Sequence, residues 1–154
     1  MSSKVIREMS IGAAELVETL FARDGVAKAM GLELLDSGEG RATVALDIRE
    51  DHLNFNGTCH GGIIFSVADM AFGLAANSHG VVAPAINASI INHASAGDSD
   101  RLTASATETS RSKRMASYLV NVVLGDGRKV ATFTASVFVT NKPHDAAADA
   151  ASGS

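Results

Sequence analysis

Residues Cys59–Gly73 read CHGGIIFSVADMAFG, and this stretch decides how the chain folds. Most of it is apolar, yet two glycines, Gly61 and Gly62, stand near its start and one carboxylate, Asp69, falls in its middle. Glycine is a poor helix former, and an unpaired carboxylate is costly to bury among apolar side chains. Because both features occur in the most hydrophobic run of the chain, they indicate chemistry as well as packing.

The same run predicts a helix over residues 63–78, ended by His79 and Gly80, which is apolar on nearly all sides. Such a helix must be buried on most of its surface. Helical spacing also marks residues 13–22, with Ser10 as the N-cap, and a short second piece at 25–30.

The remaining segments have the character of strands. Residues 31–48 form two extended segments around a glycine-rich turn, and from Ala83 onward the chain alternates as strands do. The last two strands are joined by Gly125–Arg128, a hairpin signal. We therefore expect an α+β fold in which one curved antiparallel sheet wraps around one long central α-helix.

The length of 154 residues suits a single domain with a real core. We divide the chain into an N-terminal helical segment at 1–30, the main domain at 31–140, and a disordered C-terminal tail at 141–154, where hydrophobic bulk is low.

Composition excludes several classes of function. The net charge is −4, so no global basic field attracts nucleic acid or an anionic membrane. The single cysteine rules out an internal disulfide, and no apolar run reaches the length of a membrane span. We expect a soluble cytoplasmic protein without a secretory signal.

The spacing of Gly61 and Asp69 carries a consequence for assembly. Backbone N–H groups at a helix start form a good oxyanion hole, and glycine there lets a substrate approach. Gly61 and Asp69 lie eight positions apart, about 12 Å along a helix, too far to act on one carbon. If this is an active site, two antiparallel helices from two protomers must complete it.

The run from Asn54 to Gly80, NFNGTCHGGIIFSVADMAFGLAANSHG, resembles the signature of the phenylacetate-degradation thioesterases, a branch of the hotdog-fold acyl-CoA thioesterases. The resemblance continues through AGD at 96–98 and LTASA at 102–106 to GRKVA at 127–131. It covers residues 31–140 and implies a hotdog fold.

The resemblance implies a role for each matching residue. Gly61 binds the thioester oxygen through its N–H, and Asp69 is the nucleophile or the general base. Asn54 helps to place the thioester or the water. His60, followed by Gly62, has a supporting structural role.

In similar enzymes a hydroxyl on the next strand, from the same protomer as the acid, orients the water. The expected position falls near Asn87, with Ser89 close by. Asn87 carries no hydroxyl, so this partner departs from the pattern of the family.

Arg111, Lys113 and Arg114 form the only dense basic cluster. It either holds the phosphates of coenzyme A or is a solvated turn between two strands, and we favour the first. Cys59 beside His60 is read as a small semi-buried cysteine rather than a nucleophile. The histidines and Cys59 lack standard metal-ligand spacing, so no metal site is predicted.

The resemblance implies hydrolysis of phenylacetyl-CoA and hydroxylated relatives to the free acid and CoA, in phenylacetate catabolism. It also implies a homodimer with composite active sites, paired into a homotetramer, with no cofactor beyond the coenzyme A of the substrate. Two alternatives stay open: a non-catalytic acyl-CoA-binding sensor on the same fold, and a thioesterase for medium-chain aliphatic acyl-CoA.

Overall fold

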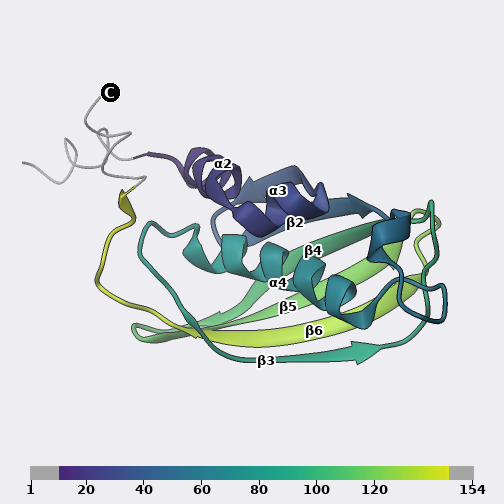
Figure 1. Cartoon of the computed structure of the whole chain (residues 1–154). Coiled ribbons are helices and arrows are strands. Elements are labelled where there is room, and N and C mark those ends of the chain that lie inside the picture. The colour runs from purple at the N-terminus through teal and green to yellow at the C-terminus, as the bar shows by residue number, and fades with distance from the viewer. Residues whose placement is uncertain (1–10, 146–154) are drawn as a thin grey trace, which may run out of the picture.

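The structure is a computed structural model that describes residues 11–145 (Figure 1). Its helices and strands follow in the order α2 (Ala13–Arg23), α3 (Gly25–Met30), β1 (Glu33–Gly38), β2 (Arg41–Asp47), η1 (Glu50–His52), α4 (Gly61–Asn77), β3 (Ala85–Asn92), β4 (Arg101–Arg111), β5 (Met115–Leu124) and β6 (Lys129–Phe138). None of the helices in this part of the chain is long and apolar enough to cross a membrane.

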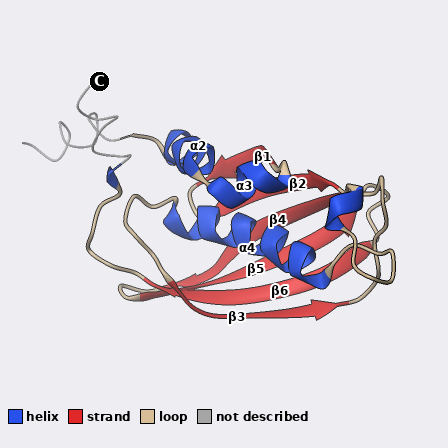
Figure 2. Cartoon of the chain, in the orientation of Figure 1, coloured by secondary structure: helices blue, strands red, loops and turns tan. Residues whose placement is uncertain are grey.

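The six strands form one antiparallel sheet in the order β1-β2-β4-β5-β6-β3. The sheet curves around α4, and α2 and α3 lie on the same side of it as α4 (Figure 2). The predicted α+β hotdog fold, a curved sheet around one central helix, is confirmed.

The core lies between α4 and the concave face of the sheet. Eight residues of α4 are buried, with the spacing of three and four that places them on contiguous faces of a helix: Ile64, Val67, Ala68, Ala71, Phe72, Leu74, Ala75 and Ala76. The Phe72 ring lies 5.6 Å from that of Tyr118 on β5 and 5.8 Å from that of Phe133 on β6. The many alanines let the sheet approach α4 closely.

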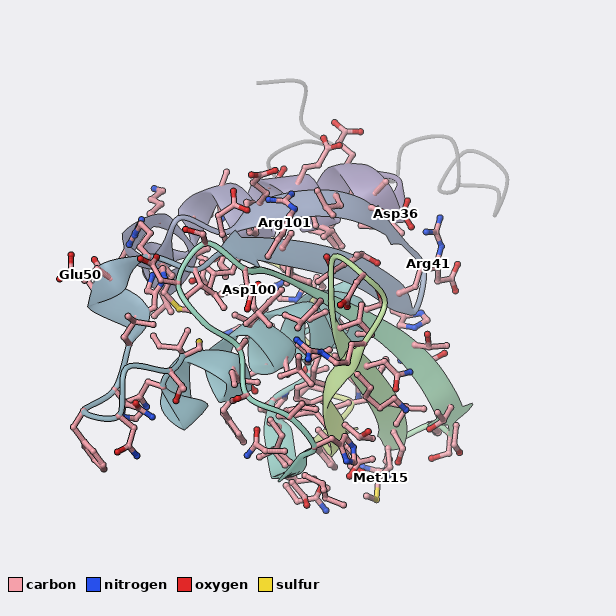
Figure 3. The ribbon with its side chains drawn as sticks, turned by 90° about the vertical axis from the view of Figure 1, so that its right-hand side faces the viewer. Asp36, Arg41, Glu50, Asp100, Arg101 and Met115 are labelled. Atoms are coloured by element: carbon pink, nitrogen blue, oxygen red, sulfur yellow. The ribbon has the colours of Figure 1, made fainter. Side chains whose placement is uncertain are left out.

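Ion pairs on the exposed surface join strands β1, β2 and β4 at one side of the sheet. Arg101 on β4 contacts Glu33 of β1 at 3.1 Å and Asp47 of β2 at 2.8 Å, and Asp36 pairs with Arg41 across the β1–β2 turn (Figure 3). Exposed pairs of this kind stabilise a fold only slightly. They favour the observed register more than they add to stability.

The two edges of the sheet differ. At one edge α2 packs against β1, whereas β3 at the other edge pairs only with β6. β3 carries Ile86 and Ile91, with 52% and 62% of their surface exposed. An uncovered edge strand with exposed apolar side chains is a template for pairing with another chain.

The helix starts differ from the prediction in two places. α4 begins at Gly61 rather than residue 63, because the side chain of His60 caps it and both glycines are helical. α2 begins at Ala13 with Gly12 as its N-cap, and the predicted cap Ser10 lies outside the described residues. Gly80, which the sequence places just after this helix, has the left-handed backbone that favours glycine, with φ of +99°.

The C-terminal segment is ordered further than predicted. The predicted disordered tail begins at residue 141, yet Val82 N–H donates to the Lys142 carbonyl at 2.8 Å, and His144 Nε2 lies 2.9 Å from Asn77 Oδ1. These contacts hold residues 141–145 against the end of α4. Residues 146–154 lie outside the described part of the chain.

Candidate active site

His60 is the N-cap of α4. Its Nδ1 accepts the N–H of Gly62 at 2.8 Å, and its carbonyl accepts the N–H groups of Ile63 and Ile64. Nδ1 must be unprotonated to accept a hydrogen bond. The imidazole therefore belongs to the start of the helix and fixes the direction of the N–H groups that follow.

Gly61 presents the first N–H of α4, and no acceptor for it exists within residues 11–145. A Cβ at Gly62 would come within 3.0 Å of His60 Nδ1, so Gly62 leaves room for the cap. A Cβ at Gly61 would meet nothing within 4 Å. Nothing in residues 11–145 therefore requires glycine at position 61, and the exposed N–H carries the partial positive charge of a helix start.

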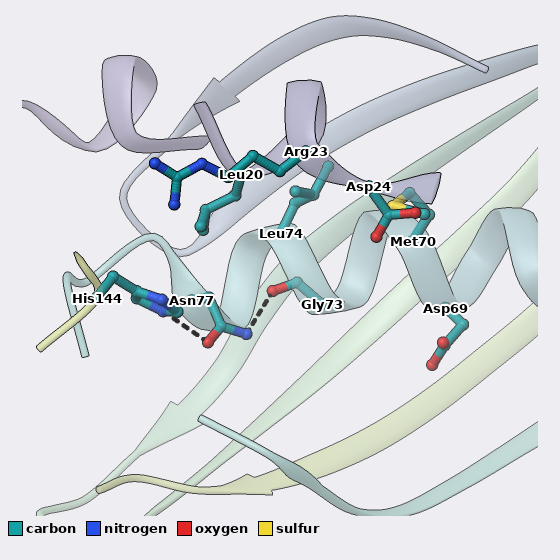
Figure 4. A pocket seen from close by; sticks show the side chains of 9 residues that line it. All are labelled: Leu20, Arg23, Asp24, Asp69, Met70, Gly73, Leu74, Asn77 and His144. Atoms are coloured by element: carbon teal, nitrogen blue, oxygen red, sulfur yellow. Dashed lines mark hydrogen bonds between the residues drawn. The ribbon is translucent and has the colours of Figure 1, made fainter. Parts of the chain in front are cut away.

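Asp69 lies two turns further along α4 with an exposed side chain. The apolar surroundings raise the pKa of its carboxyl by desolvation, and the Asp24 carboxylate raises it further. Asp24 caps α3 through a hydrogen bond from Ala27 N–H at 2.9 Å and lines the same pocket (Figure 4). A raised pKa brings a carboxylate closer to the range in which it accepts a proton efficiently.

Gly61 and Asp69 open into different pockets. The pocket at Gly61 has a volume of about 350 Å³ and is lined by Cys59, Ile64 and residues 92–95. The pocket at Asp69 has a volume of about 410 Å³ and lies between the end of α2 and the second half of α4. The two pockets share no lining residue, so one chain does not bring the donor and the acid together.

Asn54 organises the loop before α4. Its Oδ1 accepts hydrogen bonds from Asn56 N–H at 2.9 Å and from the N–H and hydroxyl of Thr58 at 3.2 and 3.3 Å. Its Nδ2 has no hydrogen-bond partner in the part of the chain that the structure describes. Asn54 lines neither pocket, so its contact with a thioester stays a prediction.

The register of β3 turns Asn87 and Ser89 away from α4. Ile90 lies opposite Phe133, which is buried, whereas Ser89 lies opposite Thr134, which is exposed. Directly paired residues share a face and successive residues alternate. Asn87 and Ser89 therefore lie on the outer face, which gives no support to a role beside Asp69 of the same chain.

The three basic candidates lie at the β4–β5 connection. Arg111 is 3.4 Å from the carboxylate of Glu108, so its charge is already engaged. Lys113 and Arg114 line a polar pocket of about 240 Å³ with residues 138–141 and make no ion pair with any residue between 11 and 145. Of the three, Lys113 and Arg114 are the better candidates for a phosphate, and this role stays a prediction.

Cys59 is buried, and burial raises the pKa of its thiol to about 11. A protonated thiol is a poor nucleophile, which agrees with the structural interpretation of this residue. Among residues 11–145, no three His, Cys, Asp or Glu side chains are grouped so that they could hold a metal ion.

Sequence reasoning missed Asp24 and His144, which line the pocket of Asp69. The Asp24-Gly25 pair carries a capping signal that could have placed Asp24 at a helix start. Its proximity to Asp69 follows only from tertiary packing of α2 and α3 on α4. His144 gave no signal, because it lies in a segment of low hydrophobicity.

The chain is similar to known thioesterases. Residues 56–131 match the Thioesterase superfamily model. The chain is 35% identical to the acyl-coenzyme A thioesterase PaaI of Escherichia coli K12, over 81% of this chain and 89% of that protein.

Two solved structures are similar as well. The E. coli PaaI protein of the phenylacetic acid degradation operon aligns with a TM-score of 0.80 and 31% identity, over 82% of this chain and 91% of that one. The smu.793 protein of Streptococcus mutans, bound to acetyl CoA, aligns with a TM-score of 0.70 and 26% identity, over 73% and 91%.

The chain belongs to the Thioesterase superfamily. It is a thioester hydrolase, and the resemblance to the phenylacetate-degradation thioesterases is confirmed. A thioesterase needs a donor for the carbonyl oxygen and an attacking group on the same carbonyl carbon. In this chain the two candidates for these roles, the Gly61 N–H and the Asp69 carboxylate, lie in separate pockets.

Gly61→Pro tests the N–H donor. Proline suits the first helical position, and the ψ of 134° at His60 is compatible with a following proline, so α4 should still form. Loss of one oxyanion donor should lower kcat by about 10²–10³-fold. Gly61→Ala keeps the N–H and should retain more activity. Equal activity of the two variants in a steady-state assay would show that the N–H is not used.

Asp24→Asn tests the electrostatic setting of Asp69. A base must be ionised, so activity falls as the pH drops through its pKa, and removal of the Asp24 charge lowers that pKa. The acid limb of the kcat/KM profile should therefore move to lower pH, while asparagine keeps the cap of α3. Asp98→Asn, which removes an exposed charge elsewhere, is the control. Identical shifts in both variants would contradict the local effect.

Proposed function

We propose that this thioesterase hydrolyses aromatic acyl-CoA thioesters, namely phenylacetyl-CoA and its hydroxylated relatives, to the free acid and CoA. Its setting is the cytoplasm and its pathway is phenylacetate catabolism. The proposal is supported by the E. coli relative, an acyl-coenzyme A thioesterase from the phenylacetic acid degradation operon. The acetyl CoA bound to the S. mutans protein supports a CoA thioester as the substrate class.

One observation carries the proposal: a free helix-start N–H at Gly61 and a carboxylate of raised pKa at Asp69 occupy separate pockets on one helix. Two copies of α4 running antiparallel bring Gly61 of one protomer beside Asp69 of the other. The minimal active unit is then a homodimer with two composite sites.

The uncovered edge of the sheet supports this assembly. β3 pairs on one side only and exposes Ile86 and Ile91. Pairing of two β3 strands would extend the sheet across the dimer and bury these side chains. Two such dimers form the proposed homotetramer.

The chemistry follows from the two groups. The Gly61 N–H polarises the thioester carbonyl, and in one route Asp69 takes a proton from water while the oxygen of that water bonds to the carbonyl carbon. The C–S bond breaks, the CoA thiolate leaves and is protonated, and the acid is released. In the other route Asp69 itself attacks and water hydrolyses the resulting anhydride. Neither route needs a metal or a further cofactor, and Lys113 and Arg114 hold the CoA phosphates.

A thiol-release assay on Asp69→Asn tests the acid and the function together. Wild type should prefer phenylacetyl-CoA over medium-chain aliphatic thioesters, and the variant should lose about 10²–10⁴-fold in turnover. Near wild-type turnover in Asp69→Asn would remove Asp69 from the mechanism. A preference of the wild type for aliphatic chains would overturn only the proposed aromatic substrate. A wild type without activity on any thioester would indicate a binding protein.

The thermal midpoint of Asp69→Asn provides the control for folding. Because the folded state raises the pKa of Asp69, ionisation disfavours folding, and the stability contributed by the neutral form is lost as the pH rises through that pKa. The near-isosteric amide carries no charge, so the midpoint at neutral pH should not fall.

Subunit mixing tests the composite site. Asp69→Asn and Gly61→Pro homodimers should each be inactive, but a mixed dimer contains one intact site, formed by Gly61 of the first chain and Asp69 of the second. Random reassortment makes half of the dimers mixed, so co-expression should restore about a quarter of wild-type activity. No recovery, with mixed dimers verified by mass spectrometry, would place both groups of a site in one chain.

A further inference from the structure

The pocket at Asp69 runs along one face of α4. Besides Asp69, four residues of α4 line it at spacings of three, one and three, namely Met70, Gly73, Leu74 and Asn77. Leu20, at the end of α2, lines the opposite wall, and His144 lies at the far end (Figure 4). Its volume of about 410 Å³ falls within the range of sites that enclose small molecules.

Gly73 is anomalous in this wall. It lies inside a helix of 17 residues, where glycine is the least favourable residue other than proline. The usual reasons for a helical glycine are absent, because its φ is not left-handed and a Cβ would meet nothing within 4 Å. The described chain therefore does not need glycine here for its own packing, and the empty space above Gly73 opens into the pocket.

We propose that the acyl group of the thioester lies across Gly73, so that this glycine sets the size and shape of the acyl group that the enzyme accepts. The inference rests on the proposed function and adds the residue that determines its specificity. The apolar part of the acyl group packs against Leu20, Met70 and Leu74, which line the same pocket.

Helix geometry defines which acyl groups fit. Gly73 lies one turn beyond Asp69, about 6 Å along the axis, and Asn77 lies a further turn away. A ring attached close to the reacting carbonyl, as in an arylacetyl group, is placed beside Gly73. A long straight chain has to pass Gly73 and reach the end of the pocket at Asn77.

The far end of the pocket is closed by polar groups that are already paired. Asn77 Nδ2 donates to the Gly73 carbonyl at 2.8 Å, and Asn77 Oδ1 accepts from Ala83 N–H at 3.0 Å and from His144 Nε2 at 2.9 Å. A long apolar chain that reached this end would cover the polar surface of Asn77 and His144 that still faces water, and would make no favourable contact in return. The pocket therefore favours a compact aromatic acyl group over a long aliphatic one.

Gly73→Ala and Gly73→Leu test this assignment by filling the space in steps. Alanine and leucine are better helix formers, so the thermal midpoint should stay or rise by about 2–4 °C. The ratio of kcat/KM for phenylacetyl-CoA to that for acetyl-CoA should fall about 10-fold in Gly73→Ala and about 100-fold in Gly73→Leu.

Gly25→Ala and Gly25→Leu are the matched controls. Gly25 is also helical, and its added Cβ would also meet nothing within 4 Å, but it does not line the pocket. These variants should leave the ratio unchanged. An unchanged ratio in Gly73→Leu would overturn the proposal. If Gly73→Leu changed the mass of the assembly but not the ratio, the space above Gly73 would be assigned to a partner chain instead of the acyl group.

A binding measurement separates this proposal from the proposed function. In an Asp69→Asn background, calorimetry compares the Kd of phenylacetyl-CoA with that of free CoA, with and without Gly73→Leu. Addition of Gly73→Leu should weaken the binding of phenylacetyl-CoA at least about 10-fold relative to that of free CoA. If wild type hydrolyses no thioester, the proposed function fails. The ratio of the two Kd values still tests whether the acyl group lies across Gly73, and an unchanged ratio overturns that assignment.

Discussion

The burial of α4 against the concave sheet is the constraint on which the rest of the molecule depends. A helix with eight buried residues, four of them alanines, is stable only where apolar strands surround most of it. The alternating burial along β5 provides such a surface. Beyond its first turn, α4 has room for polar chemistry on the face that the sheet leaves uncovered, and Asp69 and Gly73 lie there.

Both ends of α4 are also held in place. His60 caps the start, and at the other end the Ser78 hydroxyl accepts the Gly40 N–H at 2.8 Å while His79 Nε2 lies 2.9 Å from Glu108. Burial alone would raise the pKa of Glu108, but hydrogen bonds from Tyr118 and His79 lower it, so this carboxylate stays ionised. Contacts at both ends hold α4 in one position against the sheet, and the helix itself fixes the spacing of Gly61 and Asp69.

The features that could be predicted from the sequence are those that depend on residues close together in the chain. The central helix, the strands and the final hairpin follow from periodicity and turn residues, and the wide separation of Gly61 and Asp69 follows from helix geometry. The faces of Asn87 and Ser89 depend on an irregularity in the pairing between Ala85 and Asn87, which no local pattern reveals. The pocket at Asp69 combines residues from the end of α2, from α4 and from His144, and only tertiary packing brings these segments together.

Three glycines of α4 differ in how far the described chain accounts for them. Gly62 is explained inside the chain, because a Cβ there would crowd the ring that caps the helix, at 3.0 Å from His60 Nδ1. Gly61 and Gly73 have open space above them and no left-handed backbone, and Gly73, inside the helix, is unfavourable at its position. A fold that keeps unfavourable residues with no internal reason is shaped by something outside it. The open spaces face two different pockets. This is the arrangement that the proposed composite sites require, in which each α4 provides the donor for one site and the acid and acyl wall for the other.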